Sequence, residues 1–480
     1  HPYAADLDLF GRGSVFQRLC AARTRLGEDM LAEWLAGPAS VQDIRARHAA
    51  VEELRSALDL RERLAIIEAE LGEDLDQNRL RLWAARPPQP FDRRTRITAI
   101  VLGTAAVLGL ACWIVFGTVS PLIVVLMIEI VFLFRHRGRI RELAQTADDA
   151  ASGLATLADV LSVIEEQRFR SAGLVSLRDR LNVEGQPPSV RIARLRGLIQ
   201  NLSGSLQNQF FAPIALLLCL PIALVHRIEV WRAEVGPHIP EWLDAVGEFE
   251  ALSSLAGYAF EHPADPLPEF LADGPCFDAE QVGHPLLPDD VCVRNDFRLG
   301  GELRLVMVSG SNMSGKSTLL RTVGVNTVLA LAGAPVRAGR LRLSPLQVGT
   351  AMRVSDSLQQ GASLFYAVVR RLKAVADLAE GQRPLLFLLD EILQGTNSHD
   401  RRIGAEAVIR TLAGRGAVGL VTTHDLALTD IVDVLGEQAK NIHFEDHLED
   451  GRMTFDYRIR PGVVQKSNAL DLMRAVGLEV

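Results

Sequence analysis

The sequence predicts two kinds of structure in succession: an all-α region interrupted by a pair of apolar helices, then an α/β domain built on a mainly parallel sheet. Three observations support this. Residues 7–80 show helical spacing of apolar side chains, residues 97–116 contain no charge, and after residue 303 short apolar runs alternate with helical stretches. A chain of 480 residues is also long enough for two or three domains.

The N-terminal region is expected to be a helical domain over residues 1–92. Gly37 and Pro38 mark a break, and a further helix is predicted from about residue 41 to 58, with Val51 and Leu54 on one face. Prolines at positions 87, 88 and 90 then end the helical pattern.

Residues 97–116 are long enough to span a bilayer, for which about twenty apolar residues suffice. A turn follows, and residues 122–134 are apolar again but carry Glu129. Arginines flank the pair on both sides, at positions 93, 94, 96, 135, 137, 139 and 141. This pattern predicts a transmembrane hairpin over 93–141 with both ends in the cytoplasm. The alternative is a hairpin buried in a soluble core.

A third apolar run covers residues 210–225 and contains Pro213 and Pro221. Its length fits a kinked membrane segment, a helix on the membrane surface or a core helix. We assign it to a helical arm over residues 142–262.

Composition places limits on the chemistry. The chain is 48% hydrophobic and 23% charged, which is typical of a folded protein, and its net charge of −8 does not indicate a general polyanion binder. The five cysteines show no metal-ligand spacing, so we expect a reducing compartment without disulfides or a zinc site.

A glycine-rich stretch stands between an apolar run and a helical one. It fits the pattern G-x-x-x-x-G-K-[ST], in which backbone N–H groups and a helix N-terminus surround phosphate oxygens. Its predicted nucleotide-binding residues are Gly310, Ser311, Asn312, Met313, Ser314, Gly315, Lys316, Ser317 and Thr318. Lys316 is expected to reach the β- and γ-phosphates of ATP, and the Ser317 hydroxyl to ligate Mg²⁺.

Two further apolar runs end in polar residues. Residues 385–389 precede Asp390 and Glu391, and residues 418–423 precede His424. Because parallel strands end at the same edge of a sheet, Asp390 is expected to hold Mg²⁺ and Glu391 to activate the attacking water. His424 is expected to contact the γ-phosphate.

Together these motifs resemble a known family. The stretches GSNMSGKSTLLRTVG, SDSLQQGASLF, LLFLLDEILQGTNSHD and TTHD resemble the ATPase domain of the MutS family, which is of the ABC type. The resemblance runs from about residue 283 to the C-terminus, within a predicted ATPase domain over 263–480. More weakly, DLDLFGRGSVFQRLCAARTRLGEDMLAEWLAGP resembles the helical core of the same family.

The resemblance implies roles for individual residues. Lys316, Glu391 and His424 are the expected catalytic residues. Ser363 corresponds to the signature serine that reaches the partner's γ-phosphate, and Asn397 and Asp400 fall in a loop at the dimer interface. A homodimer with composite ATP sites is therefore expected, with ATP and Mg²⁺ bound.

Departures from the family pattern matter equally. No Phe-x-Glu triplet, the mismatch-reading element, occurs in the sequence, and the apolar pair stands where the DNA clamp is expected. The position of the adenine-stacking aromatic residue is matched by Cys292. These features predict a multi-pass protein of the cytoplasmic membrane, in contact with lipid, whose ATPase domain faces the cytoplasm.

The expected action is ATP-dependent DNA binding or damage sensing without sequence preference. Its candidate contacts are Arg178, Arg180, Arg191, Arg194 and Arg196. The alternative is a membrane-bound mechanochemical ATPase that acts on a protein or membrane partner without nucleic acid.

Overall fold

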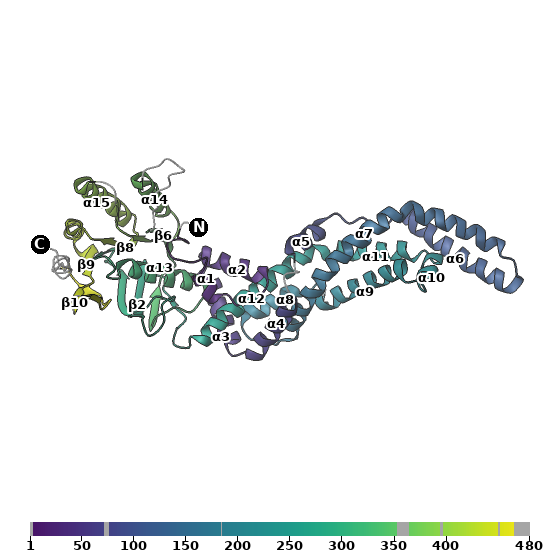
Figure 1. The fold of residues 1–480 in the computed structure, drawn as a ribbon, viewed down its shortest axis with the longest axis horizontal. Coiled ribbons are helices and arrows are strands. Elements are labelled where there is room, and N and C mark those ends of the chain that lie inside the picture. Colours follow the sequence, from purple (N-terminus) through teal and green to yellow (C-terminus); the bar gives the residue numbers. More distant parts are fainter. Residues whose placement is uncertain are drawn as a thin grey trace. The chain divides into compact units, whose positions relative to one another are not determined.

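The computed structural model describes residues 3–71, 76–183, 185–352, 364–393, 397–449 and 452–464. These residues form two compact units. Unit 1 lies within residues 1–21, 30–56 and 251–480, and unit 2 within residues 22–29 and 57–250. Figure 1 shows the helices and strands of each.

The N-terminal helices are α1 (Val15–Leu19), α2 (Arg25–Ala36) and α3 (Val41–Arg55). The predicted break at Gly37 and Pro38 is confirmed. In α3, Val51 and Leu54 are buried, as their spacing predicts, and the Ser40 hydroxyl caps the helix by accepting from the Asp43 amide.

The core of unit 1 is a sheet whose described strands have the order β12-β9-β4-β8-β7-β6. Their bounds are β4 Leu305–Ser309, β6 Gln347–Ala351, β7 Leu385–Leu389, β8 Val418–Thr423, β9 Ala439–His443 and β12 Arg460–Pro461. All neighbours pair in parallel except β12, which is antiparallel to β9. Every residue of β4, β7 and β8 is buried, which explains their uninterrupted apolar sequences.

Helices connect these strands, as the alternating pattern predicts. They are α13 (Lys316–Ala332), α14 (Leu364–Leu378), α15 (Ser398–Gly414) and α16 (Ile431–Leu435). Most residues of α13 are buried, and the loop of residues 310–315 joins its N-terminus to the end of β4.

A second sheet was not predicted. It has the order β1-β5-β2-β3, with β1 Glu269–Phe270, β2 Cys276–Val282, β3 Asn295–Gly300 and β5 Arg340–Leu343. The sequence indicates only a Pro- and Gly-rich junction before residue 290. Two further strands, β10 (Asp446–Glu449) and β11 (Arg452–Phe455), form an antiparallel pair near the end of the described chain.

Unit 2 is helical. Its helices are α4 (Leu58–Leu71), α5 (Gln77–Ala85), α6 (Arg93–Phe116), α7 (Ser120–Glu166), α8 (Ala172–Leu181), α9 (Pro188–Gln207), α10 (Ala212–Leu217), α11 (Leu220–Val235) and most of α12 (Ile239–Glu261). The longest, α7, continues without a break through residue 141, where the sequence analysis places a domain boundary.

A stripe of small residues lets α6 pack closely on its neighbours. Ala99, Gly103, Ala106 and Gly109 are its buried residues. A Cβ atom on Gly103 would lie 3.2 Å from the Leu218 backbone, and one on Gly109 would lie 3.1 Å from the Leu122 Cα atom. The helix ends at Gly117, whose left-handed φ of 69° forms the turn into α7.

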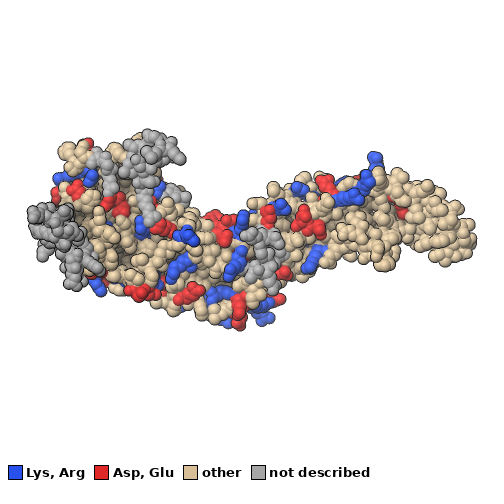
Figure 2. Space-filling view, in the orientation of Figure 1, with Lys and Arg blue, Asp and Glu red and all other residues tan. Residues whose placement is uncertain are grey.

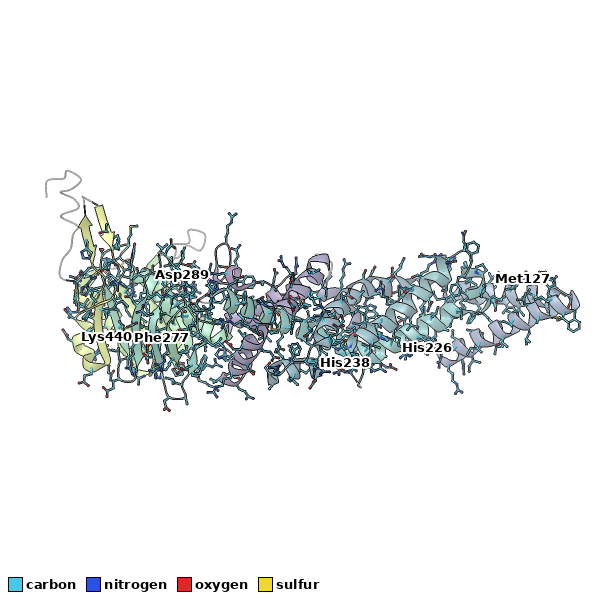
Figure 3. All side chains as sticks on the ribbon, turned by 90° about the horizontal axis from the view of Figure 1, so that it is seen from below. Met127, His226, His238, Phe277, Asp289 and Lys440 are labelled. Carbon is cyan, nitrogen blue, oxygen red and sulfur yellow. The ribbon has the colours of Figure 1, made fainter. Side chains whose placement is uncertain are left out.

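The other sides of α6 and of the first turns of α7 are apolar and exposed. Figure 2 shows the end of this pair as a surface of almost uncharged residues. Met127, labelled in Figure 3, is 64% exposed. Within the described residues, α6 alone has the length and composition of a membrane-spanning helix. The two helices and their turn are therefore present, but the transmembrane hairpin stays a prediction.

The third apolar run is not a single helix. It divides into α10 and α11, and Cys219 between them has a left-handed φ of 48°. The early part of α11 is packed inside unit 2, where Pro221, Ile222 and Val225 are buried. Of the three alternatives for residues 210–225, the core helix fits α11.

Candidate active site

The candidate site lies where three parallel strands end. The loop that joins β4 to α13 contains the predicted phosphate-binding residues, and β4 is next to β8 in the middle of the sheet. Ser309 pairs with Thr423, and Leu389 of β7 pairs with Val421 of β8. This register places Asp390 and His424, which directly follow β7 and β8, at the same edge as the loop.

The backbone of the loop has a conformation that requires glycine at its first position. Gly310 has a φ of 148°, and a Cβ atom there would lie 2.8 Å from the Ser314 hydroxyl oxygen and 3.0 Å from the Phe444 carbonyl oxygen. Gly315 caps α13 with a φ of 108°. Met313 also has a positive φ, and its side chain points to solvent at 85% exposure.

Lys316 is folded into this loop. Its Nζ atom donates to the carbonyl oxygens of Gly310 at 2.8 Å and Ser311 at 2.7 Å, and the residue is buried. Burial lowers the pKa of the Lys316 ammonium, while the carboxylates of Glu391 and Asp390 act in the opposite direction. The ammonium is thus held inside the ring of backbone where phosphate oxygens would be bound.

Two serine hydroxyls of the loop are further candidates for ligand contact. The Oγ atoms of Ser311 and Ser314 are buried and have no hydrogen-bond partner among the described residues. Buried hydroxyls are normally satisfied, so this pair fits a site that receives oxygen atoms from a ligand. Ser317 and Thr318 follow on the first turn of α13. Asn312 is exposed.

The acidic pair is organised by a residue that the sequence analysis did not single out. The Thr422 hydroxyl donates to the Asp390 carboxylate and accepts from the Glu391 amide nitrogen at 2.9 Å. Glu391 has a left-handed φ of 51°, a strained backbone of the kind found at functional sites. The only sequence signal for this role is the position of Thr422 at the end of a buried strand.

His424 lies beside the acidic pair, as predicted. Its Nδ1 atom is 3.5 Å from Oε1 of Glu391. Both side chains remain accessible, at 50% exposure for His424 and 28% for Glu391. Lys316, Asp390, Glu391 and His424 are therefore brought together by the fold.

Two of the residues expected at the dimer interface lie at the start of α15. The Asn397 side chain caps α15: its Oδ1 atom accepts from the Asp400 amide at 2.8 Å, and its Nδ2 atom donates to the Asp400 carboxylate at 2.7 Å. Within the chain these two residues thus contact each other. Ser363 lies outside the described residues.

An aromatic ring lies against the phosphate loop from an unexpected part of the chain. A Cβ atom on Gly315 would be 3.2 Å from Cδ1 of Tyr457. The backbone around Tyr457 is fixed by Asn295, which donates to the Tyr457 carbonyl oxygen and accepts from the Ile459 amide. Cys292, the position that the sequence analysis matched to the base contact, lies instead with its Sγ atom 4.0 Å from the His284 carbonyl oxygen.

The predicted arginine cluster is not one exposed surface. Arg191 is buried and donates to the Val183 carbonyl oxygen, and Arg180 pairs with Glu248. Arg178 bonds to the Gln167 carbonyl oxygen and to Asp179. Arg194 and Arg196 are exposed. The cluster was expected from sequence proximity alone, and three of its members have partners within unit 2.

A phosphate loop that begins α13, followed by an acidic strand end in a mainly parallel sheet, defines a P-loop ATPase-type α/β domain. Comparison with known families specifies it further, since residues 306–479 match MutS domain V. Over these residues the chain is similar to the MutS family.

Curated relatives agree with this assignment. Endonuclease MutS2 of Thermus thermophilus is 28% identical over 379 residues, covering 72% of this chain and 48% of that protein. DNA mismatch repair protein msh3 of Aspergillus fumigatus is 25% identical over 533 residues, 99% of this chain and 47% of that protein. DNA mismatch repair protein MutS of Natronomonas pharaonis is 32% identical over 259 residues, 52% of this chain and 30% of that protein. The chain spans about half the length of each of the first two relatives.

Proposed function

We propose that this chain binds ATP with Mg²⁺ and hydrolyses ATP at the edge formed by β4, β7 and β8. The observation that carries the proposal is the convergence of Lys316, Asp390, Glu391 and His424 on the phosphate loop. Two buried serine hydroxyls of that loop have no partner among the described residues. The donors suit phosphate oxygens, and the carboxylate suits a hard cation.

Each side chain then has a distinct task. Lys316 and the loop amides bind the phosphates, and Ser317 and Asp390 are the candidate Mg²⁺ ligands. When bound, Mg²⁺ neutralises charge that develops on the phosphate oxygens. Thr422 fixes Asp390 and the Glu391 backbone, so the Glu391 carboxylate is positioned to accept a proton from water. His424 donates a hydrogen bond toward the γ-phosphate.

Two substitutions test the hydrolysis proposal. Lys316→Ala should abolish measurable ATP binding. Glu391→Gln should keep ATP binding but reduce turnover by about 100-fold or more, the usual effect of losing a general base. Glu437→Gln, an exposed site outside this edge, is the matched control. Normal turnover by Glu391→Gln would remove Glu391 from its proposed role.

We further propose a composite site in a homodimer. The support is the family resemblance, in which Ser363 reaches the γ-phosphate bound by the other subunit and Asn397 and Asp400 fall in the loop at the dimer interface. Exposure of Glu391 and His424 in one chain is compatible with a second subunit that excludes water there.

We propose that α6 and the start of α7 anchor the chain in the cytoplasmic membrane, with unit 1 in the cytoplasm. The supports are the apolar composition of α6, its exposed apolar side chains and the arginines on both flanks. In a cysteine-free variant, Val119→Cys should react with an impermeant thiol reagent applied to intact cells. Gly138→Cys should react only after lysis, and equal labelling of both would refute this topology.

The relatives are named for DNA mismatch repair, and from them we propose ATP-dependent DNA binding without sequence preference. Purified protein should bind duplex DNA with an affinity that falls as salt rises. Arg194→Gln with Arg196→Gln should weaken binding, and the internally paired Arg180→Gln should have a smaller direct effect. No binding to duplex, mismatched or branched DNA at low salt would refute it.

A second candidate has its own support in this structure. Three of the candidate DNA-contacting arginines, Arg178, Arg180 and Arg191, have partners within unit 2. Together with the apolar surface of α6, this favours an ATPase that acts on a membrane or protein partner without nucleic acid. Crosslinking in cells, followed by identification of what is attached, separates this candidate from DNA binding.

A further inference from the structure

Unit 2 contains a cavity that the ATPase chemistry does not use. It has a volume of about 440 Å³ and lies between α7 and the segment from Leu206 to Pro221. This volume is within the ~300–1,000 Å³ range of small-molecule sites. Apolar side chains of α7 at helical spacing form one wall, and α10 contributes the other; they include Leu126, Ile130, Leu133, Phe134, Pro213 and Leu216.

One carboxylate lines this apolar cavity. Glu129 is 2% exposed, and the hydrogen-bond partner that the described residues give it is the Cys219 thiol, 3.9 Å from its Oε1 atom. A thiol is a weak donor. A buried carboxylate that lacks a strong partner is costly, so a ligand that brings N–H donors and positive charge would gain most at this point.

The backbone beside Glu129 is also unusual. Cys219 has a left-handed φ of 48° at the break between α10 and α11, in a stretch with prolines at 213 and 221. A residue other than glycine in this conformation is strained, and such strain is often found at ligand sites. The helix break and the carboxylate thus coincide at one wall of the cavity.

We propose that this cavity binds a lipophilic amine. The ammonium group donates to the Glu129 carboxylate, and the hydrocarbon body lies against the apolar wall of α7 and α10. This site is separate from the nucleotide site, and its occupation does not depend on ATP hydrolysis or on DNA.

Two arginines at the other end of the cavity would favour a ligand of the opposite charge. Arg137 and Arg141 also line it, and the Arg137 guanidinium lies 3.7 Å from the centroid of the Phe134 ring. Arg137 is eight residues from Glu129, a rise of about 12 Å along the helix. If these arginines governed recognition, an anionic amphiphile would bind in preference to an amine.

Equilibrium dialysis distinguishes these cases. The probes are radiolabelled dodecylamine and dodecanoate, with the full chain in one neutral detergent at fixed concentration. We expect saturable binding of dodecylamine, about one per chain, and at least a tenfold weaker affinity in Glu129→Gln. Glu142→Gln, an exposed site on the same helix, should bind as the unsubstituted chain does. Leu133→Trp, which fills the cavity, should lose binding with Glu129 intact.

Three results would each overturn the inference: equal or tighter binding of dodecanoate, unchanged dodecylamine affinity in Glu129→Gln, or unchanged dodecylamine affinity in Leu133→Trp. ATP turnover is measured on the same preparations. Loss of amine binding with normal turnover concerns this cavity alone, and loss of turnover with normal amine binding concerns the nucleotide site.

Discussion

The Thr422 hydroxyl links the Asp390 carboxylate to the backbone amide of Glu391 in the candidate active site. Thr422→Val keeps the shape of the side chain but removes both hydrogen bonds. We expect turnover to fall about tenfold with little change in the KM for ATP, because phosphate binding uses other residues. Thr423→Val is the control, since its hydroxyl bonds to the Asp425 backbone instead. A raised KM with normal turnover would contradict the assigned role.

Tyr457 offers an aromatic face next to the phosphate loop. We infer that its ring contacts the nucleotide. Tyr457→Ala should weaken ATP affinity about fivefold to tenfold, which is the scale of one stacking contact, and Tyr457→Phe should keep it. A fluorescent ATP analogue in a direct titration measures this without turnover. Equal affinities for the Ala and Phe variants would exclude a contact between the Tyr457 ring and the nucleotide.

The residues proposed to act on ATP could be predicted from the sequence, but the residues that position them could not. Lys316, Asp390 and His424 stand next to strand and helix ends, so their meeting follows from the rules for parallel sheets. Tyr457 is brought to Gly315 from 142 positions later in the sequence, and no local pattern reports such a contact. The same applies to the three arginines of unit 2, whose internal partners could not be read from their spacing.

At the scale of elements, two glycines on α6 and α7 differ in the space available for a side chain. Gly109 faces the Leu122 backbone at close range, whereas Gly138 has open space around its missing side chain. Gly109→Ala should therefore destabilise the α6–α7 pair by about 1–3 kcal/mol. Gly138→Ala should stabilise it by up to about 1 kcal/mol through helix propensity.

Thermal unfolding in detergent measures both glycine variants. Shifts of the same sign would show that close packing of α6 on α7 does not determine the stability of this region.

Elements with strong periodicity or continuous burial were predictable, and short paired strands were not. The runs that became β4, β7 and β8 are fully buried and therefore apolar at every position. β2 alternates buried and less buried residues and pairs with β5, about sixty residues further along the chain. β2 lies between β3 and β5 in the sheet, and such pairing depends on partners that its own residues do not specify, so the prolines and glycines around it suggested only a junction.

At the scale of the whole molecule, the composite-site proposal predicts nucleotide-dependent assembly. Glu391→Gln with ATP and Mg²⁺ should sediment as a dimer, because bound ATP that is not hydrolysed keeps two subunits together. The same variant carrying Lys316→Ala should remain in the state seen without nucleotide. Analytical ultracentrifugation in detergent measures this, and an ATP-independent dimer in both variants would argue against assembly through the nucleotide.

The unbroken course of α7 has a mechanical consequence. Its 47 residues form a rod about 70 Å long, because each residue adds about 1.5 Å. If one end of such a rod tilts by about 10°, the other end sweeps through about 12 Å, many times the size of a hydrogen-bond rearrangement. A helix of this length amplifies a small rotation into a large displacement, and two adjacent prolines placed near its centre would remove that gain.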